Sequence, residues 1–262
     1  MNDLPDRALA ALLSEQDAYR TAPPPPLPRM FRGLARPVSF LTQRLIPAEA
    51  VEAALYGADW AASASIRGVS LGHDRAALAE CEAAALDIRR WAIGYAATGG
   101  GAAGAFGAFG LAVDIPTTIT LALRTVRLTG HAYGFPGETP MERIFILDIL
   151  QLAGANSREE KRQILARLNE ERADLAPETA SNIVGLTGQA AGTHAAIRRV
   201  ASTLGVNLSA RKFGQLAPVI GAAVGAGVGA SFQNDVALAA RHAYRERWVA
   251  RHEGLIEGEA TA

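Results

Sequence analysis

The stretch GGGAAGAFGAFGLAVDIPTT, Gly99–Thr118, decides how the rest of the chain is interpreted. Glycine and alanine fill most of it, and its first charged residue is Asp114. A segment of this kind suits three structures: a membrane span, a glycine-rich loop that cradles phosphate, or a helix packed closely inside a bundle. The sequence around it ranks these three interpretations.

A phosphate-binding loop is the weakest of them. Gly99, Gly101 and Gly104 match the G-x-G-x-x-G spacing of dinucleotide-binding loops. That fingerprint requires a strand before it and an acidic residue about twenty residues beyond it. The residues before Gly99 have a helical pattern, and the chain has no Gly-Lys-Ser/Thr loop for a nucleoside triphosphate. The sequence therefore disfavours nucleotide binding, and we expect no cofactor.

Two segments carry no formal charge, residues 91–113 and residues 213–234. At about 1.5 Å per helical residue, either is long enough for a bilayer core of about 30 Å. Glycine and alanine, however, contribute little transfer free energy compared with leucine or isoleucine. Arg89–Arg90 and Arg211–Lys212 precede the two segments. Composition thus disfavours an independent membrane span but leaves peripheral or reversible insertion open.

The second uncharged segment contains Gly221, Gly225 and Gly229 in a GxxxGxxxG pattern. Residues four apart lie on one helix face, and glycines there let another backbone approach closely. Gly100 and Gly104 give a shorter version in the first segment. We therefore expect both segments to be close-packed helices, and each is the first candidate for packing against the other.

Composition favours an all-α protein of one multi-helix domain. Alanine and leucine are strong helix formers, and no alternating strand of useful length is present. Lys+Arg and Asp+Glu both number 26, so nothing favours bulk attraction to nucleic acid. The single cysteine, Cys81, excludes an intramolecular disulfide and fits a reducing cytoplasm.

The chain divides into three parts by pattern. Residues 1–30 read as an N-terminal helix and a proline-rich linker, because TAPPPPLPRM prefers extended polyproline II. Residues 31–250 form the predicted helical domain. Residues 251–262 read as a polar C-terminal tail.

Several helix boundaries follow from capping chemistry. Pro116 suits the first turn of a helix that Asp114 caps, and Gly134 suits its end. Thr139–Glu142 and Ser157–Glu160 are capping boxes, in which a hydroxyl and a carboxylate each satisfy a backbone amide at a helix start.

No local catalytic or metal-binding motif is present. The chain lacks HExxH, CxxC and GxSxG, and none of its five histidines has another three or four residues on. A hydrolase site assembled from distant residues stays open as an alternative, using Asp114, Asp148 or histidines. Asp148 interrupts the apolar run IFILDILQL and needs a partner if it is buried.

A polar stripe follows the glycine-rich stretch. It advances by three or four residues and comprises Thr117, Thr120, Arg124, Arg127 and His131. One interpretation is the solvated face of an amphipathic helix. The other is a cationic site for a phosphate or lipid headgroup, since an arginine fork matches those oxygens.

The order of these features resembles the EcsC family, bacterial proteins named from an ABC-transporter operon. The first matching block runs from the glycine-rich stretch through Asp114-x-Pro116 and Arg124 to Glu142-Arg143. The second block is KFGQLAPVIGAAVGAGVGASFQNDVALAARHAYRERW, with the glycine pattern before Asn234. The resemblance implies a helical domain with a membrane-associated accessory role and does not imply catalysis.

We therefore expect a non-enzymatic, cytoplasmic protein that is peripheral at the inner membrane, with membrane lipid or a membrane protein as partner. A soluble helical scaffold or regulator is the first alternative, and the non-local hydrolase is the second. The oligomeric state is left open. The candidate functional or structural residues are Asp114, Pro116, Thr117, Arg124, Arg127, Asp148, Gly221, Gly225, Gly229 and Asn234.

Overall fold

The computed structural model describes residues 6–24, 48–105, 107–175, 186–212 and 221–259. This part of the chain forms eight helices and no strand, so the predicted all-α class is confirmed. The helices are α1 (Asp6–Thr21), α4 (Ala48–Ile66), α5 (Leu78–Ala105), α6 (Gly107–Ala132), α7 (Pro140–Ala153), α8 (Arg158–Asp174), α9 (Leu186–Lys212) and α10 (Gly221–Glu259).

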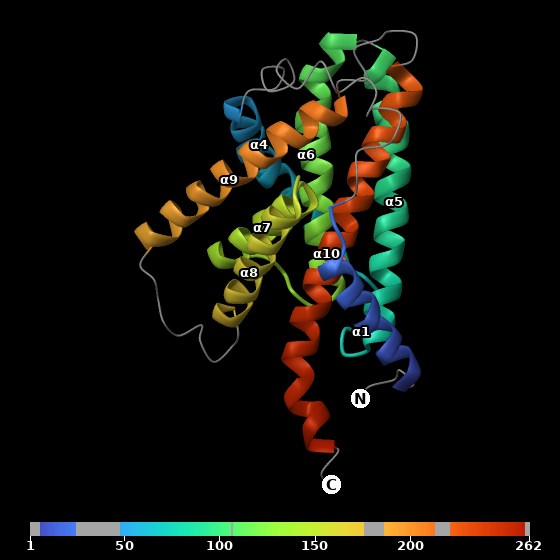
Figure 1. Cartoon of the computed structure of the whole chain (residues 1–262), viewed down its shortest axis with the longest axis vertical. Helices are drawn as coiled ribbons and strands as arrows, with labels where there is room; N and C mark the ends of the chain where they lie inside the picture. Colours follow the sequence, from blue (N-terminus) through green and yellow to red (C-terminus); the bar gives the residue numbers. More distant parts are fainter. Residues whose placement is uncertain (1–5, 25–47, 106, 176–185, 213–220, 260–262) are drawn as a thin grey trace.

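Three long helices form the centre of the bundle. α5 and α6 form a hairpin, and α10 packs along α5 and also against α6 (Figure 1). α4 and α7 pack on α6, while α8 and α9 pack on α7. The apolar face of α6 is buried through Ile119, Leu123 and Val126, as its 3.6-residue spacing predicts.

Small residues let α5 and α10 approach closely. A Cβ added at Gly229 would lie 3.1 Å from the carbonyl oxygen of Ala96, which is backbone and cannot move aside cheaply. The two uncharged segments therefore pack on each other, as expected. Gly221 and Gly225 belong to the first turns of α10, and their surroundings lie outside the described part.

The predicted helix start at Asp114 and Pro116 is wrong. α6 begins at Gly107, so Pro116 lies inside the helix and Asp114 is not its N-cap. An interior proline costs one hydrogen bond, because it has no N–H for the carbonyl four residues earlier, and its ring also crowds that carbonyl. The sequence signal is ambiguous, because the residues around Pro116 fit a proline in a first turn as well as one in a helix interior.

Capping chemistry placed other boundaries correctly. Thr139 caps α7 and accepts from the Glu142 amide at 3.2 Å, while the Glu142 carboxylate accepts from the Glu138 amide at 2.9 Å. The Glu160 amide donates to the Ser157 hydroxyl at 3.1 Å. Gly134 has a φ of +81° just past the end of α6. Both capping boxes and this glycine stop are confirmed.

The two terminal helices meet in the lower half of the bundle (Figure 1). α1 lies against α10, where its Gln16 side chain donates to the carbonyl of His242 at 3.2 Å. α10 continues to Glu259, so residues 251–259 are helical. The proline-rich stretch falls outside the described residues.

Candidate functional site

One end of the bundle combines all the uncharged helix segments. The end of α5, the start of α6 and the start of α10 meet there (Figure 1). We call this region the uncharged end and define it as residues 91–105, 107–113 and 221–234. On α5 it extends for about 20 Å, at about 1.5 Å per residue.

A polar clamp marks the base of the uncharged end. Arg89 on α5 donates to the Asn234 side-chain oxygen on α10 through Nε at 2.9 Å and Nη2 at 2.7 Å. Both contacts are charge-assisted, which makes them stronger than neutral hydrogen bonds. Asn234 therefore fixes the register between the two helices at the level where charge disappears from both.

Large aromatic side chains are exposed at the same level. Trp91 is 45% exposed and Tyr95 is 51% exposed, and their rings stack with centroids 5.4 Å apart. Separately, Trp60 on α4 is 68% exposed and follows Asp59, which pairs with Arg127 and Arg143. Aromatic rings with one polar atom are favoured where an apolar phase meets water. Sequence analysis missed these residues, because their exposure depends on how α4, α5 and α6 pack.

Arg124 joins α4 to this aromatic group. Its Nη1 donates to the carbonyl of Ser65 at 2.5 Å, and its guanidinium lies 5.3 Å from the centre of the Trp91 ring. A cation over a tryptophan face is attracted to the ring. Arg124 thus lies beside the exposed rings and keeps its charge close to the uncharged end.

Asp114 faces the interior of the bundle rather than capping a helix. It is buried, and the Thr118 hydroxyl lies 3.4 Å from its carboxylate. The Gln233 amide of α10 donates to the carbonyl of Thr118 at 3.1 Å. Pro116 and Thr117 are exposed on α6. Asp114 therefore belongs to a polar contact region between α6 and α10.

The predicted polar stripe is divided by the structure. Arg127 is buried, pairs with Asp59 on α4, and donates to the carbonyl of Gly137 at 3.0 Å. Arg143 reaches the same Asp59 carboxylate at 3.2 Å. Arg127 therefore fastens α4 to α6, and its guanidinium is occupied within the protein.

Asp148 points inward and is fully buried on α7. Arg167 of α8 donates to it at 3.0 Å, and Arg199 of α9 donates at 3.2 Å. Burial, followed by the negative charge of Asp148 and a hydrogen bond with it, raises the pKa of Glu171 to about 9. Asp148 is the centre of a charged cluster that joins three helices.

The histidines lie in separate surroundings. His73 contacts the carbonyl of Ala132 at 2.8 Å, and His194 contacts the Tyr56 hydroxyl. His252 contacts the carbonyl of Trp248 at 2.8 Å. Within the described ranges no group of three histidine, cysteine or acidic residues is placed to hold a metal. These contacts do not link the histidines to Asp114 or Asp148.

A second buried charge cluster was not foreseen. Glu82 on α5 accepts from Nε of Arg241 and Nε of Arg245, both at 2.6 Å, and from the Tyr133 hydroxyl at 2.6 Å. Burial alone would raise the pKa of Glu82, but Arg245, Tyr133 and Arg241 together lower it. The four-residue spacing of the two arginines on one helix was the available signal.

Comparison with known proteins gives a family and one distant relative. The model of the EcsC protein family matches residues 28–249. Uncharacterized protein YdbA of Bacillus subtilis (strain 168) is 32% identical over 148 residues, which cover 56% of this chain and 50% of that protein. The match thus spans half the length of this relative. No solved structure matches the chain significantly.

Proposed function

The chain belongs to the EcsC protein family, and on that premise we propose that it is a non-enzymatic, membrane-peripheral accessory protein. It inserts the uncharged end of its bundle into one leaflet of the membrane. Its partners are membrane lipid or a membrane protein such as a transporter. The observation that carries the proposal is the exposure of Trp91 and Tyr95 on the uncharged part of α5.

The dimensions agree with shallow insertion. The uncharged part of α5 extends about 15 Å beyond Tyr95, and one leaflet contributes about 15 Å of hydrocarbon. Within the described residues, no helix has both the length and the apolar character needed to cross a bilayer. Insertion of a bundle end needs no crossing helix, and only the terminal backbone groups of each helix lack a partner within the helix.

Charge distribution supports the same orientation. Arg89, Arg90 and Arg124 lie at the base of the uncharged end. Arginine side chains at this depth reach headgroup phosphates while aromatic rings remain at the interface. The uncharged tip would then lie in the hydrocarbon, the aromatic rings at the interface and the arginines among the headgroups.

Vesicle flotation with tryptophan emission tests the proposal. The protein is mixed with vesicles of phosphatidylcholine and phosphatidylglycerol, and the floated fraction is measured. We expect the protein to float and its emission to shift to shorter wavelength, because Trp91 leaves water. Trp248 is buried in the free protein and contributes a constant background.

Two matched variants make the test specific. Trp91→Ser removes an apolar side chain at the uncharged end, whereas Leu13→Ser removes one from α1 with the same 45% exposure. We expect Trp91→Ser to reduce flotation several-fold and Leu13→Ser to leave it unchanged. No flotation of the wild-type chain, or equal loss in both variants, would contradict the proposal.

A soluble helical scaffold is the second candidate. The contact of Gly229 with the Ala96 backbone favours it, because small residues are then explained by packing alone. If the protein is such a scaffold, we expect no vesicle binding and no shift of the tryptophan emission.

A further inference from the structure

α1 is attached to the bundle in an unusual way. Among the helices that the structure describes, it alone has no close helix-to-helix packing with another. Leu12 and Tyr19 are only partly buried, and Leu13 is exposed. Contacts of long polar side chains therefore make up most of the attachment of α1 to the bundle.

The centre of this attachment is a pair of arginines with an acid on each side. Glu82 accepts from Nε of both arginines and from Nη2 of Arg245, while Nη1 and Nη2 of Arg241 and Nη2 of Arg245 also reach α1. Glu15 of α1 accepts from Arg241 at 2.9 Å and from Arg245 at 3.1 Å. Because Glu82 fixes both arginines, the pair is preorganised for a second carboxylate. Glu15 is that ligand, and its side chain remains 41% exposed.

The contacts beyond this pair recognise a helix rather than a single anion. His242 stacks on Tyr19 with ring centroids 4.0 Å apart, and its Nδ1 contacts the Gln16 amide oxygen at 2.6 Å. Burial, then Arg245, Arg241 and Lys161, lower the pKa of His242 to about 2. The ring is therefore neutral and suited to stacking and to a neutral hydrogen bond.

The far end of the helix is recognised as well. Glu246 accepts from Arg20 at 2.8 Å. Lys161 of α8 donates to the carbonyl of Ala22 at 3.0 Å, just past the end of α1. A cation at a helix C-terminus interacts favourably with the helix dipole and the free carbonyls. We call these five residues the seat: Lys161, Arg241, His242, Arg245 and Glu246.

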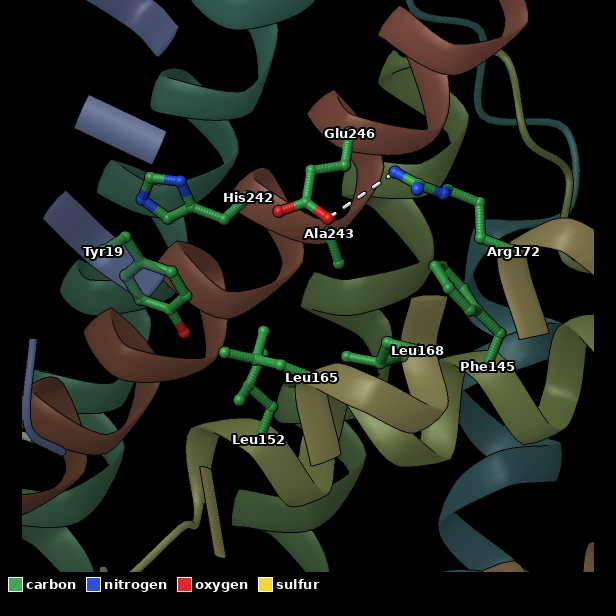
Figure 2. A pocket seen from close by; sticks show the side chains of 9 residues that line it. All are labelled: Tyr19, Phe145, Leu152, Leu165, Leu168, Arg172, His242, Ala243 and Glu246. Carbon is green, nitrogen blue, oxygen red and sulfur yellow. Dashed lines mark ion pairs between the residues drawn. The ribbon is translucent and has the colours of Figure 1, made fainter. Parts of the chain in front are cut away.

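A hollow with apolar walls adjoins the seat. Figure 2 shows the Tyr19 ring beside His242, with Leu152, Leu165 and Leu168 extending toward the same space from below. Glu246 at its rim faces Arg172 at 3.7 Å. An incoming helix thus meets charged groups on one side and an apolar wall on the other.

Seat and occupant belong to different parts of the chain. All five seat residues lie within residues 28–249, which match the family model, whereas α1 lies before them. The seat is therefore a feature of the family domain in this chain, and its occupant is supplied by an extension.

We propose that the seat is a docking site for a helix of another protein and that α1 is its intramolecular occupant. The partner helix carries a carboxylate that bridges Arg241 and Arg245, with an aromatic ring about one turn later to stack on His242. The seat lies at the opposite half of α10 from the uncharged end, so docking does not depend on membrane insertion.

A peptide with the sequence of residues 6–21, labelled with fluorescein, serves as the probe. Its binding is measured by fluorescence anisotropy on the full chain and on an opened full chain with Glu15→Gln and Tyr19→Ala in its own α1. Tethered α1 competes at high effective concentration in the wild type. We expect the opened chain to bind the peptide at least tenfold more tightly.

Two altered peptides have the same net charge and separate recognition from general attraction. The Glu15→Gln peptide loses the bridging carboxylate, whereas the Asp17→Asn peptide changes an exposed residue. We expect about tenfold weaker binding for the first and no change for the second. Equal binding of the two peptides, or no gain on opening, overturns the proposal.

Two further measurements keep the result interpretable. If the opened chain loses helicity by circular dichroism, Glu15→Gln alone replaces it as the milder opening. Light scattering then reports the oligomeric state of the wild type. A dimer that Glu15→Gln abolishes would mean that a second copy occupies the seat, which overturns a separate partner helix. Vesicle flotation of the opened chain should stay unchanged, so failure here is distinct from failure of membrane binding.

Discussion

The two halves of α10 hold the protein together by opposite means. Its first part, residues 221–234, is uncharged, and at Gly229 it approaches the α5 backbone closely because no side chain intervenes. Its second half is rich in arginine and meets α5 through the Glu82 carboxylate. The same pair of helices thus changes from contact by small side chains to contact by charge-assisted hydrogen bonds. Packing in the uncharged part requires that side chains stay small, whereas packing in the charged part requires that every hydrogen-bond partner be present.

The charged half should be the more sensitive to a single deletion. Glu82→Gln leaves Arg241 and Arg245 buried with half their compensating charge, and we expect a loss of about 3–5 kcal/mol in the free energy of unfolding. Urea unfolding measures it. Asp87→Asn, which breaks the exposed pair with Arg90 on the same helix, should cost about 1 kcal/mol or less. Similar losses in both would remove the distinction between the halves.

The small-residue half should fail by overpacking. Gly229→Leu drives a side chain into the Ala96 carbonyl, and we expect a loss of about 1–3 kcal/mol in unfolding free energy. At Gly227 an added Cβ meets nothing within 4 Å. Gly227→Leu should therefore stabilise the helix by up to about 1 kcal/mol. If chemical denaturation gives both variants the same sign, close approach is not what limits this half.

The boundary between the halves can be measured as a coupling. Asn234→Ala removes the oxygen that accepts both hydrogen bonds from Arg89, and we expect a loss of about 1–2 kcal/mol in the free energy of thermal unfolding. In a double-mutant cycle, Arg89→Ala should then add little further. Strictly additive losses would mean that the clamp does not act as a pair.

A pH-dependent effect comes from outside this comparison and is read as a slope with pH. Burial and Asp148 raise the pKa of Glu171 from 4.5 to about 9, so the folded state retains a proton that the unfolded state loses. Its contribution to stability is present below pH 4.5 and is lost as pH rises toward 9. The advantage of Glu171→Gln over wild type should therefore grow from pH 5 to pH 9, by less than about 1.4 kcal/mol per pH unit. A constant difference in urea midpoints would contradict the shifted pKa.

Local chemistry in the sequence predicted some boundaries and not others. The capping boxes at Thr139 and Ser157 succeed because all their partners lie within four residues. The start of α6 was misplaced at Pro116, because the same residue is acceptable in a first turn and tolerable in an interior. A local sequence pattern therefore predicts a helix boundary only where it is compatible with a single structure.

Long-range pairing explains what the sequence left undetermined. The direction of Asp148 depends on Arg167 and Arg199, which come from two later helices. The seat depends on Glu82 and Arg245, far apart in the chain. From a single sequence, charged residues in alanine-rich helices are expected to be solvent-exposed. Only the packing of the helices shows which of them are buried.

The length and continuity of α10 have a mechanical consequence. Its 39 residues extend about 58 Å with no proline among them, so the helix behaves as one stiff rod. The rod has the uncharged end at its beginning and the α10 residues of the seat, Arg241–Glu246, just past its middle. The Arg89–Asn234 clamp and the Glu82 contacts both hold this rod to α5, so the uncharged end and the seat keep a fixed spacing along one helix.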